Sequence, residues 1–395
     1  MDRKYDSEIF IICKNMAFKF LAVLSVLILS FISAEILSRL YLFAVDYKDT
    51  HVPCTQAESF ETPGEYFGLY DVISERTTDP IIGGLSILKP YATGKGYKIN
   101  GQSFRYDEDI PEKPGENEVR VFITGGSVAF GAGVNMDQVY SSVAENYIKE
   151  LIPESRVRFI NAGVGGVVST NERVWIENHV IRYTPSYVIM FSGWNDTYYG
   201  HDGGSNFPKE LSKAYGLPFS ENKRPNINKI FPPLSTDDYV LKSIYIIELV
   251  IRNLRVGDII YKYMIDEDDI IQIILKNNYS INSFLSDRGI KFIYYLQPSL
   301  FSTDKSLVEC EKYNIYYYNK LYRKFPEYNN RIYTKLREIL PQHAREYGYV
   351  YVDSDTIINK SEDGIFFDFA HMGERGNRLV GEHMAKLIHN LETSP

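Results

Sequence analysis

Apolar and polar residues follow two alternating patterns in the chain after about residue 117. Short apolar runs, which indicate buried strands, alternate with longer segments whose apolar residues recur every three or four positions, as on one face of a helix. Five strands are predicted, at Val119–Thr124, Val157–Gly163, Ser186–Gly193, Lys291–Pro298 and Tyr349–Asp353.

Amphipathic helices are expected between and after these strands. Their apolar stripes cover residues 139–151, 171–182, 270–285 and 374–391, and a long helical region at 305–347 has a break near Pro326. Strands and helices in this order predict a parallel, doubly wound sheet with right-handed crossovers. The predicted fold class is α/β, a three-layer α/β/α arrangement around a five-stranded parallel sheet.

Two segments depart from this rhythm. Residues 46–116 are rich in Gly, Pro, Thr and Tyr without a helical period, which predicts an irregular N-terminal arm. Residues 200–267 carry loop signals and then a helical run, and an insertion of this length usually covers an active face or binds something. The globular domain is expected to span residues 117–395 and to contain this insertion.

The chain begins with an apolar segment at residues 16–45. No charge occurs from Phe20 to Ala34, and a helix from about Met16 to Tyr41 would be long enough to span a bilayer. Basic residues are more frequent before this segment than close behind it, which predicts a cytoplasmic tail at residues 1–15.

The chain is therefore expected to be a single-pass membrane protein. An uncleaved signal anchor would leave everything after about Tyr47 outside the cytoplasm, in the periplasm or at the cell surface. A cleaved signal peptide ending at Ala34 is the alternative, although Ile32 makes a poor cleavage site.

Composition limits the partners of the chain. Its 51 acidic and 43 basic residues give a net charge of −8, and no long basic patch occurs, so nucleic acid is not an expected partner. The 32 tyrosines and 22 phenylalanines suit sugar rings, but tyrosine also fills strands and cores. Three cysteines exclude a disulfide scaffold and a cysteine zinc cluster, and a bond between Cys54 and Cys310 stays open.

Candidate chemical groups follow four of the predicted strands. Ser127 comes just after the first strand, the glycines of Asn161–Gly166 after the second, and Asn195 after the third. The fifth strand is followed by Asp368, three residues ahead of His371. The carboxyl ends of parallel strands share one sheet edge, which is where such sheets bind ligands, so we expect these groups to meet there.

These residue types are the ones that acyl transfer requires. A serine hydroxyl is a weak nucleophile, so a histidine must accept its proton, and a carboxylate on the other ring nitrogen orients the imidazole. The tetrahedral intermediate carries a negative oxygen that needs preorganised donors. The N–H groups of Ser127 and Gly166 and the Asn195 amide are the predicted donors.

Structural alternatives exist for each residue. Ser127 could be a helix N-cap, His371 could cap the last helix, and Asn195 with Asp196 could form an Asx turn. Trp194 is expected to pack in the wall of the site rather than to serve as a sugar platform. The sequence lacks HExxH, GxGxxG and P-loop motifs, so neither a metal nor a cofactor is expected.

The four blocks resemble the SGNH hydrolases, the superfamily that includes GDSL esterases and lipases. GGS at 125–127, NAGVGG at 161–166, GWND at 193–196 and DFAH at 368–371 are similar to its four blocks, although Gly126 stands where GDSL members carry aspartate. The resemblance implies a flavodoxin-like fold, with Ser127 as nucleophile, His371 as base and Asp368 as its partner. It also implies that Ser127, Gly166 and Asn195 form the oxyanion hole. The arm and the membrane segment look like members associated with bacterial surface polysaccharides.

The expected function is that of a serine esterase that hydrolyses acyl esters, O-acetyl above all, on a small-molecule or extracytoplasmic glycan substrate through an acyl-Ser127 intermediate. One alternative is an O-acyltransferase that uses the same triad on polysaccharide, with the insertion excluding water. A second is an inactive glycan-binding or assembly protein, against which the presence of Ser127, Asp368 and His371 argues.

Overall fold

A computed structural model describes residues 25–26, 29–41, 76–79, 85–94, 96–201, 264–321 and 324–393. The chain divides into two compact units, Met1–Val52 with Pro225–Ile259, and Pro53–Arg224 with Ile260–Pro395. The predicted cytoplasmic tail lies outside the described residues, as do Cys13, Cys54 and almost all of the predicted insertion.

Residues 29–41 of the smaller unit are helical. Arg39 pairs with Glu35 one turn earlier at 2.9 Å, whereas Leu29, Leu37 and Leu40 are 58–66% exposed. Among the described residues no helix is both long and apolar enough to cross a bilayer. Only part of the predicted span at 16–45 lies within the described residues, and that span stays a prediction.

The larger unit is built on a five-stranded sheet, which confirms the predicted α/β class. The strands stand in the order β6-β5-β7-β8-β9, and every neighbouring pair is parallel. Their bounds are β5 Val119–Gly125, β6 Val157–Asn161, β7 Tyr187–Ser192, β8 Lys291–Leu296 and β9 Val350–Asp353. Each overlaps a strand predicted from the apolar runs.

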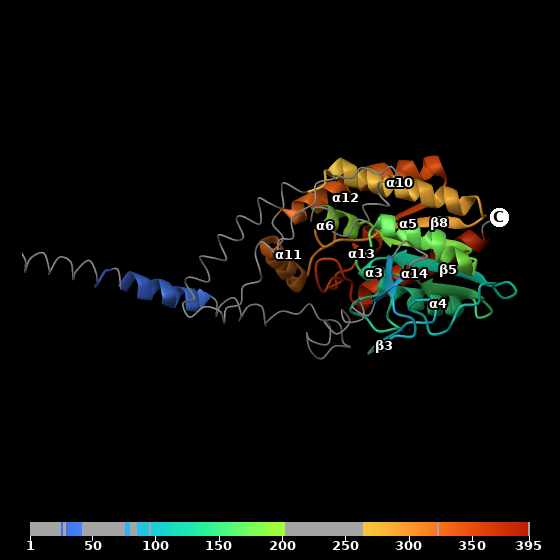
Figure 1. Ribbon diagram of the computed structural model, residues 1–395, viewed down its shortest axis with the longest axis horizontal. Helices are drawn as coiled ribbons and strands as arrows, with labels where there is room; N and C mark the ends of the chain where they lie inside the picture. Colours follow the sequence, from blue (N-terminus) through green and yellow to red (C-terminus); the bar gives the residue numbers. More distant parts are fainter. Residues whose placement is uncertain are drawn as a thin grey trace, which may run out of the picture. The chain divides into compact units, whose positions relative to one another are not determined.

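Helices cover both faces of this sheet (Figure 1). Those that match predicted segments are α4 Tyr140–Leu151, α5 Ser169–Asn178, α10 Glu267–Ser286, α11 Glu309–Leu321, α12 Phe325–Tyr347 and α14 Glu374–Thr393. The break predicted near Pro326 separates α11 from α12, and Pro326 lies in the first turn of α12, where its missing N–H has no intrahelical partner to lose. Shorter elements are α3 Ser127–Phe130, the 3-10 helix η2 Val180–Tyr183, α6 Trp194–His201 and α13 Asp355–Ile358.

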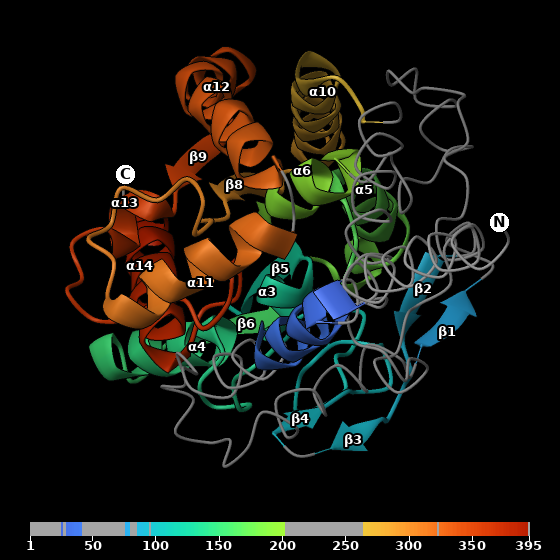
Figure 2. The same cartoon turned by 90° about the vertical axis from the view of Figure 1, so that its left-hand side faces the viewer.

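Two apolar cores lie on opposite faces of the sheet. Successive residues of a strand point to opposite faces, so Phe122 packs with α5, α10 and α12, whereas its neighbours Val121 and Ile123 pack with α4 and α14. Figure 2 shows α10 and α12 on one side of the sheet and α4 and α14 on the other. The central strands are buried on both faces, which fixes their carboxyl ends in place.

The described part of the N-terminal arm packs into the larger unit. It contains two small antiparallel ladders, β1 Arg76–Asp79 with β2 Leu85–Leu88 and β3 Thr93–Gly94 with β4 Tyr97–Lys98. Phe104 is 0% exposed and its ring contacts Phe122 of β5 at a centroid distance of 5.4 Å. The sequence places the start of the domain at residue 117, but the core already includes residues of the arm.

The order in which the chain adds strands to the sheet reverses between β5 and β7, although the strands themselves stay parallel. The chain crosses from β5 to β6 on one side, and then returns past β5 to β7, β8 and β9 on the other. In open parallel sheets the crevice at such a reversal is the place where ligands bind. Ser127 follows β5 and Asn195 follows β7, so both lie at this reversal of the strand order.

Candidate active site

Two glycines place Ser127 directly past the end of β5. A Cβ added to Gly125 would lie 2.3 Å from the carbonyl oxygen of Phe191, and one added to Gly126 would lie 2.3 Å from Asn195 Nδ2. Gly125 also has a φ of +148°, which side chains rarely adopt. Gly126 is the N-cap of α3 and Ser127 its first residue, so Ser127 is not the N-cap that the sequence left as an alternative.

The side chains of Ser127, His371 and Asp368 form one hydrogen-bonded line. The Ser127 hydroxyl lies 2.8 Å from His371 Nε2, and His371 Nδ1 lies 2.7 Å from Asp368 Oδ2. His371 and Asp368 are 4% and 7% exposed, whereas Ser127 is half-buried. With Nδ1–H donating to the carboxylate, Nε2 accepts from the serine hydroxyl, which is the tautomer that a general base needs.

Asp368 is held as a carboxylate by its surroundings. Its Oδ1 accepts the backbone N–H groups of Ala370 at 2.8 Å and His371 at 2.7 Å. Burial alone would raise the pKa of Asp368, but its electrostatic attraction to His371 and the hydrogen bonds from His371 and Ala370 outweigh burial and hold the pKa below its ordinary value. The negative charge that orients His371 is therefore maintained at neutral pH.

Helix α11 supports the loop that carries Asp368 and His371. Glu311 Oε1 accepts the N–H groups of Ile365 at 2.7 Å and Phe366 at 3.0 Å, and Asn314 donates to the carbonyl of Phe367 at 3.0 Å. Glu311 Oε2 forms a fully buried ion pair with Lys305 at 2.9 Å. His371 precedes α14, which begins at Glu374, and its ring belongs to the line with Ser127 rather than to a helix cap.

The predicted oxyanion donors lie around the same turn. Asn195 Nδ2, besides its approach to Gly126, donates to the carbonyl of Val167 at 2.7 Å. Gly166 precedes Val167 and has a φ of +73°, and the Val164 N–H of the same loop donates to the Gly125 carbonyl at 2.9 Å. The loops after β5, β6 and β7 are thus bonded to one another next to Ser127.

Asn195 and Asp196 belong to a helix, whereas the sequence treated them as part of a loop. Both lie in the first turn of α6, and their side chains bond to the loop after β6 instead of forming an Asx turn. The eight residues of α6 carry little apolar periodicity, because one side meets the core and the other meets the site, so the sequence pattern could not reveal it.

Two buried residues bond to the backbone of the turn that begins at Ser127, and the sequence analysis gave neither of them this role. The Arg105 guanidinium donates to the carbonyls of Gly96, Phe130, Gly131 and Val134 at 2.7–2.8 Å. Asn161 Nδ2 donates to the carbonyl of Ala129 at 2.8 Å. These bonds satisfy the carbonyl end of α3, which is too short to provide its own partners. Asn161 was visible in the NAGVGG block, but nothing in the sequence pattern marked Arg105.

Aromatic rings form a wall beside His371. Trp194 stacks with Phe369 and with Tyr198 at centroid distances of 5.0 Å and 4.9 Å. The residue is only 6% exposed, so Trp194 packs in the wall and does not offer an open ring face to a sugar. Phe367 stacks on the imidazole of His371 at 5.7 Å and restricts the ring plane.

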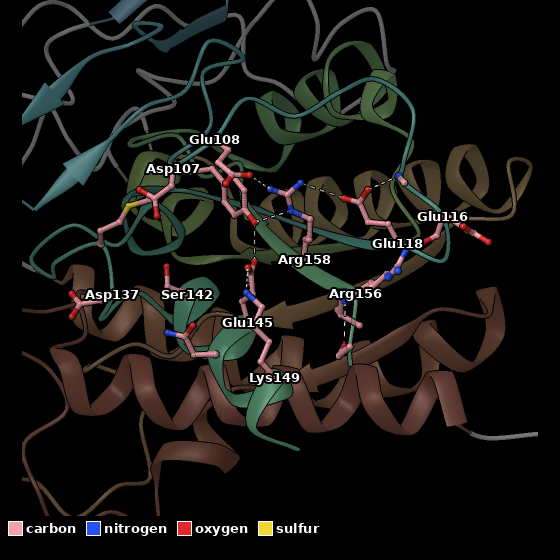
Figure 3. A pocket seen from close by; sticks show the side chains of 16 residues that line it. Asp107, Glu108, Glu116, Glu118, Asp137, Ser142, Glu145, Lys149, Arg156 and Arg158 are labelled. Atoms are coloured by element: carbon pink, nitrogen blue, oxygen red, sulfur yellow. Dashed lines mark hydrogen bonds and ion pairs between the residues drawn. The ribbon is translucent and has the colours of Figure 1, made fainter. Parts of the chain in front are cut away.

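A groove of about 920 Å³ lies elsewhere on this unit, between the arm, α4 and the edge strand β6 (Figure 3). Arg158 stands between Glu108 and Glu118 in it, and Lys149 pairs with Glu145. None of the three aligned residues Ser127, His371 and Asp368 lines this groove, so its size does not bear on the chemistry of the site. Within the described residues no cluster of three or more His, Cys, Asp or Glu is arranged to hold a metal ion.

Comparisons with known proteins give no sequence relative. No protein-family model and no curated protein matches the chain. Among solved structures it is similar to a GDSL-like lipase from Bacteroides thetaiotaomicron, with 13% identity over 70% of this chain and 91% of that one and a TM-score of 0.39. It is also similar to Axe2, an acetylxylan esterase from Geobacillus stearothermophilus, with 14% identity over 68% and 93% and a TM-score of 0.38. Similarity this weak carries no argument, and the function must rest on the geometry of the chain itself.

Proposed function

We propose that the protein is a serine esterase of the SGNH type, which hydrolyses acyl esters through a covalent acyl-Ser127 intermediate. One observation carries this proposal: the hydroxyl, imidazole and carboxylate of Ser127, His371 and Asp368 stand in line, at 2.8 Å and 2.7 Å, beside the reversal of the sheet. Nucleophile, base and orienting acid are the three groups that ester cleavage by serine requires.

The first half of the reaction forms the acyl-enzyme. Ser127 Oγ attacks the ester carbonyl carbon while His371 Nε2 takes the hydroxyl proton. The carbonyl oxygen becomes negative and accepts hydrogen bonds from the N–H groups of Ser127 and Gly166 and from the Asn195 amide. The intermediate collapses, the bond to the alcohol oxygen breaks, and His371 returns the proton to the departing alcohol.

The second half releases the acid. A water molecule gives a proton to His371 and attacks the acyl carbon, and the bond to Ser127 Oγ breaks as the serine regains its proton. Asp368 stabilises the imidazolium in both halves and prevents the ring from rotating.

We further propose that the substrate is an O-acylated glycan outside the cytoplasm and that residues 16–45 anchor the enzyme in the membrane. Cys310 forms a disulfide bond, and such bonds persist in oxidising compartments. The exposed leucines of helix 29–41 support an anchor, because a contiguous apolar surface of this kind is normally covered by lipid or protein. The glycan follows from that compartment and from the resemblance of the four blocks.

The decisive experiment is the release of p-nitrophenolate from p-nitrophenyl acetate by the full chain. Wild type should show a burst equal to the enzyme concentration, followed by turnover, and Ser127→Ala should show neither. Ser142→Ala on α4 makes the same chemical change at a half-buried serine of the distant groove and should behave as wild type.

The other outcomes separate the alternatives. A burst that is followed by turnover only when a sugar acceptor is added would identify an acyltransferase. Neither a burst nor turnover in wild type, together with no acyl-Ser127 in a mass spectrum, would reject ester chemistry and leave a glycan-binding protein.

A further inference from the structure

The segments that carry Gly166 and Asn195 are joined by a closed ring of bonds. The Asn195 amide donates to the carbonyl of Val167 at 2.7 Å. The next residue, Asp196, accepts the N–H of Ser169 at 3.1–3.2 Å. Only Val168 separates Val167 from Ser169, so short stretches of backbone complete the ring. Gly166 directly precedes it.

The Asp196 carboxylate closes this ring from its buried side. Its Oδ1 accepts the Ser169 hydroxyl at 2.5 Å, and Asn277 of α10 donates to the same hydroxyl oxygen at 2.9 Å. The amide of Asn277 therefore directs the hydroxyl proton toward Asp196. The Asp196 side chain is 0% exposed, so no bulk water competes for these bonds.

Asp196 is a stronger partner for Ser169 as an anion than as a neutral acid. Burial raises the pKa of Asp196 to about 6, while the hydrogen bonds from Ser169 lower it, so the group is mostly ionised at neutral pH. Ser169 is the first residue of α5, where free N–H groups favour a negative partner. Hydrogen bonds to an ionised acceptor are about twice as strong as neutral ones.

We propose that Asp196 is a positioning residue that fixes the spacing between the Gly166 N–H and the Asn195 amide. The inference rests on the proposed ester chemistry, in which these two groups receive the oxyanion. Asp196 is fully buried and does not touch the substrate, and it acts through Asn195 on one side and the Val167–Ser169 backbone on the other. A donor displaced by about 1 Å can lower a rate by roughly a hundredfold, so loosening the ring should affect catalysis more than binding.

The test is a double-mutant cycle on the acylation rate constant, measured from the burst with p-nitrophenyl acetate. Asp196→Asn should lower this constant by about tenfold or more. The substrate concentration that gives half-saturation should stay within about twofold of wild type. Asn195→Ala should lower it by about a hundredfold or more. In the double variant, the fold-loss of the acylation rate constant should be smaller than the product of the two single fold-losses by at least about fivefold. The reason is that Asn195→Ala has already removed the donor that Asp196 positions.

A purely structural role would give a different pattern. The two effects would multiply in full, or the loss would appear in half-saturation and thermal stability rather than in acylation. Asp355→Asn is the matched control, because it makes the same change in a buried carboxylate after β9, and its acylation rate should stay within about twofold of wild type.

A milder variant covers the case in which Asp196→Asn does not fold. Ser169→Ala removes the hydroxyl bonds to Asp196 and Asn277 but keeps the backbone bond to Asp196. It should lower acylation by about threefold to tenfold, again less than multiplicatively with Asn195→Ala. The inference would be overturned if the variants acylate at the wild-type rate, or if their fold-losses multiply in full with that of Asn195→Ala. In either case the activity of wild type would still support the proposed esterase function. Absence of a burst in wild type would overturn both.

Discussion

Arg105 shows how much of a candidate active site can depend on one residue that carries no chemistry. Its guanidinium donates to four main-chain carbonyls in and around the turn that begins at Ser127, and Arg105 is 1% exposed. Burial lowers the pKa of this group, which the charge of Asp137 partly opposes. The planar guanidinium directs several N–H donors at fixed angles, and the single ammonium group of lysine cannot reproduce this arrangement.

We therefore expect Arg105→Lys to lower the free energy of unfolding by about 2–3 kcal/mol, because buried carbonyls lose their donors while a charge stays buried. Activity with p-nitrophenyl acetate should fall as well, since α3, which begins at Ser127, would shift. Urea unfolding and burst kinetics on the same sample measure both. Arg156→Lys, at an exposed backbone contact with Glu116, is the control and should change neither. Unaltered stability of Arg105→Lys would contradict the role assigned to the four bonds.

The same residue marks the limit of what the sequence could predict. Ser127, Asp368 and His371 were predicted because they follow apolar strands in the sequence and because their chemistry is complementary, and the structure brings their side chains into hydrogen-bonding distance. Arg105 and Asn161 act on backbone carbonyls, which every residue has, so no second sequence feature identifies their partners. Their role depends on which carbonyls α3 leaves unpaired, and that is a property of the folded turn.

At the scale of elements, the long apolar runs and helical stripes predicted the sheet and its major helices. The bounds of β5, β7 and β8 differ from prediction by only one or two residues, because buried parallel strands are almost continuously apolar. The short helices α3, α6 and α13 were not predicted. They span one or two turns, too few for a helical period to stand out, and their positions are set by contacts with the sheet edge.

Helix α11 offers a test of how an element supports the site. Glu311→Gln should lower the free energy of unfolding by about 3–5 kcal/mol, because Lys305 would remain buried without its counter-charge. Esterase activity should fall with it, since Glu311 holds the backbone just ahead of Asp368. Thermal unfolding followed by circular dichroism measures the loss.

The control lies two residues earlier on the same helix. Glu309 pairs with Lys312 at the surface, with side chains 90% and 57% exposed, so Glu309→Gln should change stability by less than about 0.5 kcal/mol. Equal losses in the two variants would show that the buried pair has no special part in holding the loop.

For the whole molecule, the buried Glu172 couples stability to pH. Burial raises its pKa from 4.5 to about 8, the repulsion of Asp196 adds to this, and the bonds from Ser192 and Thr124 oppose it. The folded protein therefore binds more protons than the unfolded chain between about pH 4.5 and pH 8. Stability from this group is fully present below pH 4.5 and is lost as the pH rises toward 8.

Glu172→Gln removes this dependence. The free energy of unfolding of wild type relative to Glu172→Gln should decrease from pH 5 to pH 8, by at most roughly 1.4 kcal/mol per pH unit. Urea titrations of both proteins at pH 5, 6.5 and 8 give the difference, which includes the coupling between Glu172 and Asp196, whereas titrations of groups remote from Glu172 cancel. Parallel pH profiles would mean that Glu172 is ionised in the folded protein.

The packing of Phe104 and Arg105 has a consequence for any proteolytic release of the enzyme. Both residues come from the segment between the proposed anchor and the sheet. Phe104 packs against Phe122 of β5, and Arg105 bonds to the carbonyls of Phe130 and Gly131 at the end of α3. A protease that cut between Arg105 and Val119 could free the catalytic body only by separating it from its own scaffold. Cleavage at that point should therefore abolish the proposed activity, whereas cleavage ahead of the arm should leave it intact.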